Sequence, residues 1–205
     1  MNTYPLLSVL SCSALLTLSS CKNPADETVD AEVSEAGQAA ISKGGATYTF
    51  TDASTIGFTG TKVTGSHSGE FKKFSGSFTV LDGEPQSGNF TIDMDSTTSD
   101  SEKLTTHLKN AAFFNVPKFP TTEFVVTEFV KKGEKSYTLS GNLTLHGVTK
   151  NITFPTTVEV GDSLIKVNAE FDIKRQEFGI SYPGKKDDLI RDEVIIKLAL
   201  EAKPN

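Results

Sequence analysis

The sequence predicts an all-β fold, an antiparallel barrel of about eight strands with one short helix. The first observation is strict alternation: Tyr137, Leu139, Leu143 and Leu145 share one face of an extended chain, with polar residues between them. A period of two is typical of a strand with one buried face. The second observation is that short links join almost all the predicted strands, which favours antiparallel neighbours around a common interior. A two-sheet sandwich has the same periodicity and stays open as the alternative.

The alternation begins at Ala46 and continues to the end of the chain. We predict strands over residues 47–51, 54–63, 71–81, 87–95, 121–130, 137–145, 152–160, 164–173 and 194–200. Asp82-Gly83 and His146-Gly147 lie between strands and indicate hairpin turns, because glycine adopts positive φ without strain. Residues 65–69 are interpreted as a flexible turn. Residues 174–191 are interpreted as a looped insertion that turns at Tyr182-Pro183-Gly184.

One helix is predicted, over residues 101–110. Leu104 and Leu108 form an apolar stripe with helical spacing, and Ser99 or Asp100 can cap the first turn. Two helix-breaking prolines follow, at positions 117 and 120. We therefore expect a single helix between the fourth and fifth predicted strands.

The first twenty residues have the character of a signal peptide. They carry no charged side chain and include two short apolar runs, which are too short to span a bilayer. Leu18-Ser19-Ser20-Cys21 resembles a bacterial lipobox, in which the cysteine becomes the acylated first residue. We therefore expect a lipid anchor at Cys21 that holds the protein in the bacterial cell envelope, facing the periplasm, on the outer membrane. The alternative is an ordinary secretory signal without lipidation, and the lysine or arginine usual near the start of a signal is missing.

Residues 21–45 differ in composition from the rest of the chain. They contain five acidic residues, many alanines and few large apolar side chains. Such a segment buries too little surface to offset the entropy lost on ordering. We therefore predict a disordered acidic tether over residues 21–45 and a barrel domain over residues 46–203.

Composition excludes several classes of function. The chain has 20 Lys and Arg against 26 Asp and Glu, a net charge of −6, which argues against a nucleic-acid partner. Both cysteines lie in the first 21 residues, and His67, His107 and His146 lack the spacing of metal ligands. We therefore expect no metal, no cofactor and no enzyme activity. The 14 phenylalanines suit either a dry core or a pocket for a hydrocarbon.

Three segments carry a resemblance to a known family. They are residues 107–120 with His107-Leu108, Phe113-Phe114 and Phe119-Pro120, residues 141–149 with Leu-His-Gly-Val-Thr-Lys, and residues 171–179. With them, the chain resembles the YceI-like family of secreted polyisoprenoid-binding, lipocalin-like barrels. The resemblance covers roughly residues 46–203. The family has no short catalytic motif that could be matched to residues of this chain.

The resemblance implies that the barrel holds a long isoprenoid lipid, of the quinone or polyprenyl phosphate type, for carriage or storage. The inward faces would then line the lumen, and the helix with the residues after it would lie at the mouth or floor. The ligand-binding residues expected on this basis are Phe58, Phe78, Phe90, Ile92, Met94, Leu104, Leu108, Phe113, Phe114, Phe124, Leu143 and Phe154. Two alternatives stay open: a structural or stress-related envelope protein whose barrel is filled by its own side chains, and an enzyme acting on a lipid head group. A homodimer also stays open.

Overall fold

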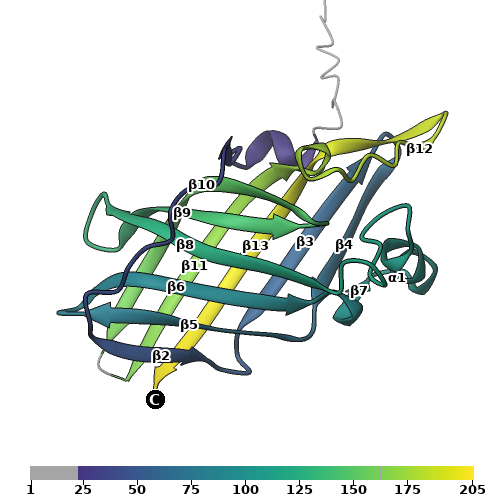
Figure 1. Ribbon diagram of the computed structural model, residues 1–205. Coiled ribbons are helices and arrows are strands. Elements are labelled where there is room, and N and C mark those ends of the chain that lie inside the picture. Colours follow the sequence, from purple (N-terminus) through teal and green to yellow (C-terminus); the bar gives the residue numbers. More distant parts are fainter. Residues whose placement is uncertain (1–22, 162) are drawn as a thin grey trace, which may run out of the picture.

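The computed structural model describes residues 23–161 and 163–205. The signal peptide predicted over residues 1–20 and the lipid anchor predicted at Cys21 lie outside the described residues. Thirteen strands, one α-helix and three 3₁₀ helices make up the described chain (Figure 1). The strands are β1 (Glu32–Ser34), β2 (Ala46–Phe50), β3 (Thr55–Lys62), β4 (Gly65–Phe71), β5 (Phe74–Leu81), β6 (Glu84–Asp93), β7 (Thr97–Ser99), β8 (Thr121–Lys131), β9 (Ser136–Leu145), β10 (Val148–Gly161), β11 (Leu164–Lys174), β12 (Gly184–Lys185) and β13 (Asp188–Pro204). The helices are α1 (Glu102–Lys109), η1 (Pro24–Glu27), η2 (Met94–Ser96) and η3 (Arg175–Phe178).

Eight of the strands close into an antiparallel barrel. Around the ring they follow the order β2, β5, β6, β8, β9, β10, β11 and β13, and β13 pairs with β2 to complete the circle. Closure gives every strand an inward face. The predicted all-β, lipocalin-like barrel of about eight strands with one helix is confirmed.

Three further strands, β3, β4 and β7, widen one end of this barrel. β13 is 17 residues long and pairs with β2 only near its C-terminal end, whereas its earlier part pairs with β3. β4 then pairs with β3, and β7 pairs with β4, so this wall extends beyond the ring and ends beside α1 (Figure 1). The barrel thus has a narrow end at β2 and a wide end at β3, β4, β7 and α1.

Two hairpin turns have the geometry that the sequence predicts. Asp82 and Gly83 have φ angles of 53° and 78°, and His146 and Gly147 have the same pair of values. Two successive residues with positive φ match the right-handed twist of the flanking strands. These turns fix the β5–β6 and β9–β10 registers, and therefore decide which side chains of those strands face inward.

The helix is confirmed, but its cap differs from the expected one. α1 begins at Glu102, and the Ser101 hydroxyl accepts a hydrogen bond from the Leu104 amide at 3.4 Å. Ser101 is extended, which places its oxygen over the first turn. Ser99, one of the two expected caps, instead accepts at its hydroxyl from the Ser101 amide and donates its own amide to Thr105.

Residues 65–69, interpreted from the sequence as a flexible turn, belong to strand β4. Glycine and serine are poor strand formers, but β3 pairs with the whole of this segment and β7 pairs with its last residue, Gly69. Asp100 also binds it from the side, accepting from the Ser68 amide and contacting His67 Nδ1 at 2.9 Å. Tertiary pairing therefore overrides local propensity here. The insertion at 174–191 likewise contains η3, β12 and the first residues of β13.

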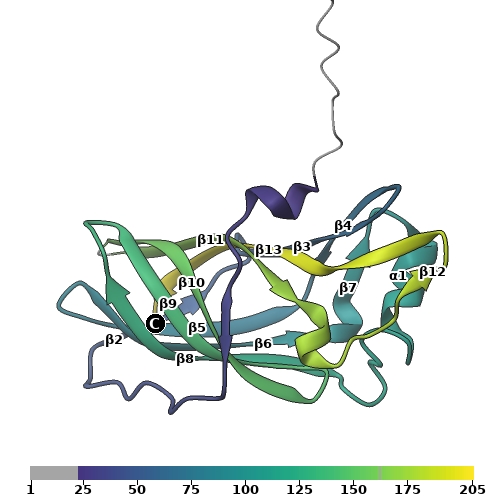
Figure 2. The same cartoon turned by 90° about the horizontal axis from the view of Figure 1, so that it is seen from above.

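The described part of the predicted tether also differs from expectation. Residues 24–27 form η1, β1 pairs with β10, and the Ala40 amide donates to the Val126 carbonyl at 2.9 Å. Figure 2 shows this purple segment lying along the barrel wall. The composition argument counted only side-chain burial, whereas this segment is held largely by backbone hydrogen bonds to the barrel.

Candidate functional site

A cavity of about 850 Å³ occupies the wide end of the barrel. Its lining is mainly apolar, and it is built from the inward faces of the strands together with α1 and the residues after it. Ten of the twelve expected ligand-binding residues line it: Phe58, Phe90, Ile92, Leu104, Leu108, Phe113, Phe114, Phe124, Leu143 and Phe154. Their contact with a ligand stays a prediction.

Strand register sets one row of these side chains. Phe90 on β6 lies opposite Phe124 on β8, which lies opposite Leu143 on β9. The rings of Phe90 and Phe124 stack with their centroids 5.0 Å apart. Gly141 makes room for this row, because a Cβ atom there would lie 2.1 Å from the Phe124 ring. A single alternating pattern thus produces a continuous apolar wall across three strands.

Two of the expected residues do not line the cavity. Phe78 is buried toward the narrow end, where its ring packs against Phe50 at 5.3 Å and Phe129 at 6.3 Å. Met94 is fully buried in η2, because β6 ends at Asp93 and the alternation ends with it. The structure therefore places both residues in the packed core and not at the site.

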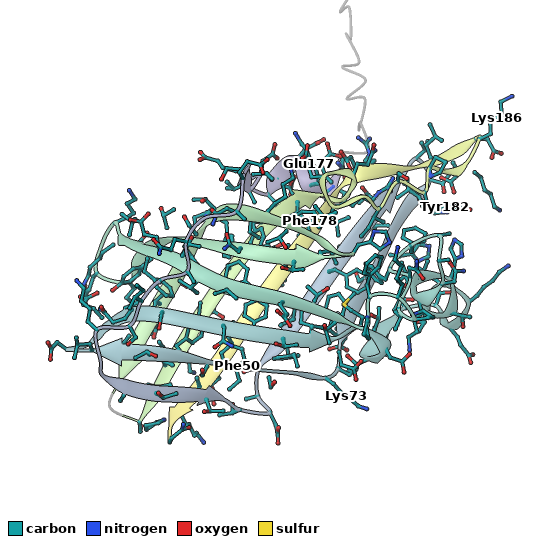
Figure 3. All side chains as sticks on the ribbon, viewed as in Figure 1. Phe50, Lys73, Glu177, Phe178, Tyr182 and Lys186 are labelled. Atoms are coloured by element: carbon teal, nitrogen blue, oxygen red, sulfur yellow. The ribbon has the colours of Figure 1, made fainter. Side chains whose placement is uncertain are left out.

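An aromatic cluster closes part of the mouth. His107 of α1, Phe113 and Tyr182 contact one another pairwise, with ring centroids 5.0–5.2 Å apart. Tyr182 comes from the late insertion and lies on the side of α1 (Figure 3). The sequence indicated only a turn at Tyr182, since nothing local shows that this loop reaches the helix. The cluster joins two segments distant in sequence across the cavity's rim.

Polar groups are concentrated among the residues contributed by β3, α1 and the insertion. Lys62 and Asp188 form an ion pair at 2.5 Å, and the Lys62 hydrogen bond holds the pKa of Asp188 below its ordinary value. Thr61 and Thr122 are buried, and their hydroxyls have no hydrogen-bond partner among the described residues. Four cations and one carboxylate line the cavity, in a chain of net charge −6: Lys62, Lys103, Arg175, Lys185 and Asp188.

Arg175 is the most buried of these charged groups. Its side chain donates to the backbone carbonyls of Ile180 at 2.6 Å, Arg191 at 3.0 Å and Ile190 at 3.3 Å. Burial lowers the pKa of the guanidinium, while the charge of Asp192 opposes that shift. The three carbonyls bear no net charge, so the cation at this wall is solvated by backbone dipoles instead of by a carboxylate.

Several lining residues were missed as site residues. β11 contributes Phe171 and Ile173, and β13 contributes Val194, Ile196 and Leu198. Their alternation was visible in the sequence, but it does not tell how far along the barrel each residue lies. Arg175 and Ile180 had no such signal, because the chain around them is not regular strand, and Phe71 is the last residue of β4, a strand that the sequence did not predict.

The three histidines lie apart. His67 bonds to Asp100, His107 belongs to the aromatic cluster, and His146 packs against Phe119 with ring centroids 4.6 Å apart. Within residues 23–161 and 163–205, no three His, Cys, Asp or Glu side chains converge as a metal site. Over the same residues, no helix is long and apolar enough to cross a bilayer.

The fold and the site together define a class of protein: a lipocalin-like antiparallel barrel with an apolar internal cavity and a polar mouth. Residues 48–202 match the YceI-like domain family, and the chain belongs to it. The family resemblance seen in the sequence is thereby confirmed.

Similarity to individual relatives is moderate. A UPF0312 protein of Pseudomonas putida (strain W619) is 34% identical over 124 residues, which span 57% of this chain and 65% of the relative. The YceI protein of Salmonella arizonae is 35% identical over 121 residues, spanning 55% of this chain and 63% of that protein. The matched segment is therefore less than two thirds of each relative's length.

Two solved structures share the fold. Burkholderia cenocepacia BcnA superimposes with a TM-score of 0.67 at 24% identity, covering 73% of this chain and 96% of BcnA. A polyisoprenoid-binding domain from Saccharophagus degradans, implicated in plant cell wall breakdown, gives 0.65 at 17% identity and covers 79% of this chain and all of that domain.

Proposed function

We propose that this protein binds a long isoprenoid lipid inside the barrel and carries or stores it without chemical change. The observation that carries the proposal is the cavity itself, about 850 Å³ of mainly phenylalanine- and aliphatic-lined space in the wide end of a closed barrel. This volume lies in the usual range for ligand pockets, about 300–1,000 Å³. The polyisoprenoid-binding neighbour from Saccharophagus degradans supports the choice of lipid.

The chemistry of the lining suits a hydrocarbon tail. An isoprenoid tail has no hydrogen-bonding groups, so its affinity comes from the area it removes from water, at about 25 cal/mol per Å². Phe90, Phe124 and Phe154 line the cavity, and their side chains carry no polar atom. The tail would lie along this wall, where nothing polar loses hydration on binding.

The polar mouth suits an oxygen-rich head group. The hydroxyls of Thr61 and Thr122 lack partners among the described residues, and Arg175 lines the same cavity. A quinone offers carbonyl oxygens to these donors, and a polyprenyl phosphate offers charged ones. The excess of cations around the cavity favours the phosphate, because it stabilises an anion more than a neutral ring.

Binding explains the charged groups better than catalysis does. Lys62 and Asp188 are engaged with each other, and Arg175 is held by three carbonyls. Groups fixed in this way position a head group. A general acid or base would instead need a free, poised proton.

The cellular setting belongs to the same proposal. A lipobox cysteine at position 21 would anchor the protein in the bacterial envelope, with the barrel facing the periplasm. Asn23 is buried against the barrel, only two residues after Cys21. An acylated Cys21 would therefore hold the cavity close to the bilayer that supplies its lipid.

A pair of tryptophan variants tests the binding proposal. Leu143→Trp would project an indole into the cavity from its wall, whereas Val125→Trp places an indole on the neighbouring strand, at a residue that does not line the cavity. We expect Leu143→Trp to lose at least tenfold in affinity for solanesyl phosphate in a fluorescence titration, and Val125→Trp to bind as wild type does. Equal affinities for both variants would contradict a ligand in this cavity.

A further inference from the structure

The barrel wall has a seam between β10 and β11. These two strands pair only where residues 157–161 meet residues 164–168. Beyond that point β10 keeps β9 on one edge and β11 keeps β13, but the two strands no longer bond to each other. The backbone groups that face across the seam therefore need another partner.

The N-terminal segment supplies that partner. Residues 28–34, here called the strap, lie in the seam and bond to both of its sides (Figure 2). On one side, Glu32 to Ser34 pair with residues 151–153 of β10. On the other, the Ala31 amide donates to the Asp172 carbonyl at 2.9 Å, and the Asp172 amide donates to the Val29 carbonyl at 3.1 Å. The strap thus completes the wall.

The seam lies directly over the cavity. Phe154 on β10 and Phe171 on β11 both line the cavity, and their rings stack across the seam with centroids 3.8 Å apart. Ile152 and Ile173, also in the lining, flank this pair on the two strands. Only side chains therefore separate the strap from the cavity. Side chains change rotamer far more easily than the backbone hydrogen bonds of a barrel wall break.

The strap is held more weakly than the wall around it. Its strand is three residues long, Val29 is 54% exposed, and Val33 is only partly buried. Its side-chain hydrogen bond to the wall is partly buried: the Thr28 hydroxyl donates to Asp172 at 2.7 Å. The strap also lies outside residues 48–202, the family domain. Segments with few buried apolar contacts open at a low free-energy cost.

We propose that the seam between β10 and β11 is a lateral portal for the lipid tail and that the strap is its gate. This rests on the proposed function, because a portal needs a ligand. A tail passing sideways enters the cavity without first threading its whole length through the mouth. The Phe154–Phe171 pair separates to admit it, and the strap re-forms its hydrogen bonds afterwards.

A disulfide across the strap tests the gate directly. Glu32→Cys and Thr153→Cys create cysteines at directly opposed strand positions, within the distance that a disulfide spans. Cys12→Ser and Cys21→Ser are added to the full chain so that only this pair oxidises. The same protein, oxidised and then reduced, serves as its own control.

The measured quantity is the uptake of solanesyl phosphate from phosphatidylcholine vesicles. We expect the oxidised protein to load at least tenfold more slowly than the reduced protein and to reach the same final occupancy. Equal rates would overturn the portal and leave the binding proposal intact. No loading by either form, or by wild type, would overturn the binding proposal.

A second pair of variants loosens the strap instead. Thr28→Val removes the hydrogen bond to Asp172, whereas Thr49→Val removes a comparable hydroxyl contact, to Asn205 at 2.5 Å, on β2. We expect Thr28→Val to load several-fold faster than wild type and Thr49→Val to load at the wild-type rate. Wild-type rates for both variants would also overturn the portal.

Discussion

Replacing Phe78 and Phe90 separately by alanine distinguishes a cavity from a packed core. Both side chains are buried, with 2% and 8% of their surface exposed. Phe78 is surrounded by other side chains at the narrow end, while Phe90 faces the existing cavity. The two variants lose the same transfer free energy, about 1.5–3 kcal/mol. They differ in the new space that each leaves behind.

The cavity term can be worked out for the two sites. At Phe78, a new cavity of roughly 100 Å³ at about 24 cal/mol per Å³ adds about 2.4 kcal/mol, for a total of about 4–5 kcal/mol. At Phe90 one side of the ring already faces empty space, so fewer contacts are lost and we expect about 2–3 kcal/mol. The predicted difference in the free energy of unfolding is therefore about 2 kcal/mol.

Chemical denaturation of the lipid-free protein measures this difference. Midpoints in urea, with the slope held common, give the free energy of unfolding for wild type and both variants. Equal losses at the two positions would refute the reasoning. Such a result would place Phe90 in a close-packed core and favour a barrel filled by its own side chains.

Three further predictions concern other groups. Burial raises the pKa of the Asp172 carboxyl; the charges of Asp30 and Glu193 act in the same direction, and the Thr28 hydrogen bond opposes them. The contribution of this carboxyl to folding stability is therefore complete in acid and is lost as the pH rises through the raised pKa. Asp172→Asn should thus protect the Ala31 amide from hydrogen exchange increasingly better than wild type as the pH rises from about 4 to 7, and a pH-independent difference would contradict this. Thr122→Val removes a hydroxyl that has no hydrogen-bond partner among the described residues. We therefore expect unchanged or higher stability in urea and at least threefold weaker binding of solanesyl phosphate. Unchanged binding would exclude a polar contact between Thr122 and the ligand. Cys21→Ser should move the protein from the membrane to the soluble fraction, since acyl chains bind at about 0.8 kcal/mol per buried CH₂, and a membrane-bound variant would disprove the lipid anchor.

The strands and most of the inward faces could be predicted because their signal is local. Alternation alone identifies the faces of Phe90, Phe124 and Leu143, since a period of two fixes the side of a strand on which each residue lies. Gly83 and Gly147 mark two hairpins for an equally local reason, the need for positive φ. These features depend on a few neighbouring residues and not on the rest of the fold.

Other features depend on contacts between distant segments. Phe78 and Phe90 have the same pattern in sequence, yet only the closure of the barrel decides that one lies in the core and the other at the cavity. Arg175 and Tyr182 reach the site through an irregular insertion. In the strap, Val29, Ala31 and Val33 do alternate with polar residues, but the run is short and its side chains are small. It is held by backbone hydrogen bonds to β10 and Asp172, which are distant in sequence.

Mass spectrometry of an organic extract tests the central claim most directly. The full chain carrying Cys21→Ser, which the account expects to be soluble, would be expressed in a bacterial host, exported, purified without detergent and extracted, with Leu143→Trp added in the same background and treated in parallel. The account predicts that wild type yields a long-chain isoprenoid in near-stoichiometric amount and that Leu143→Trp yields little. Recovery of no isoprenoid from wild type, or of equal amounts from the two proteins, would contradict it.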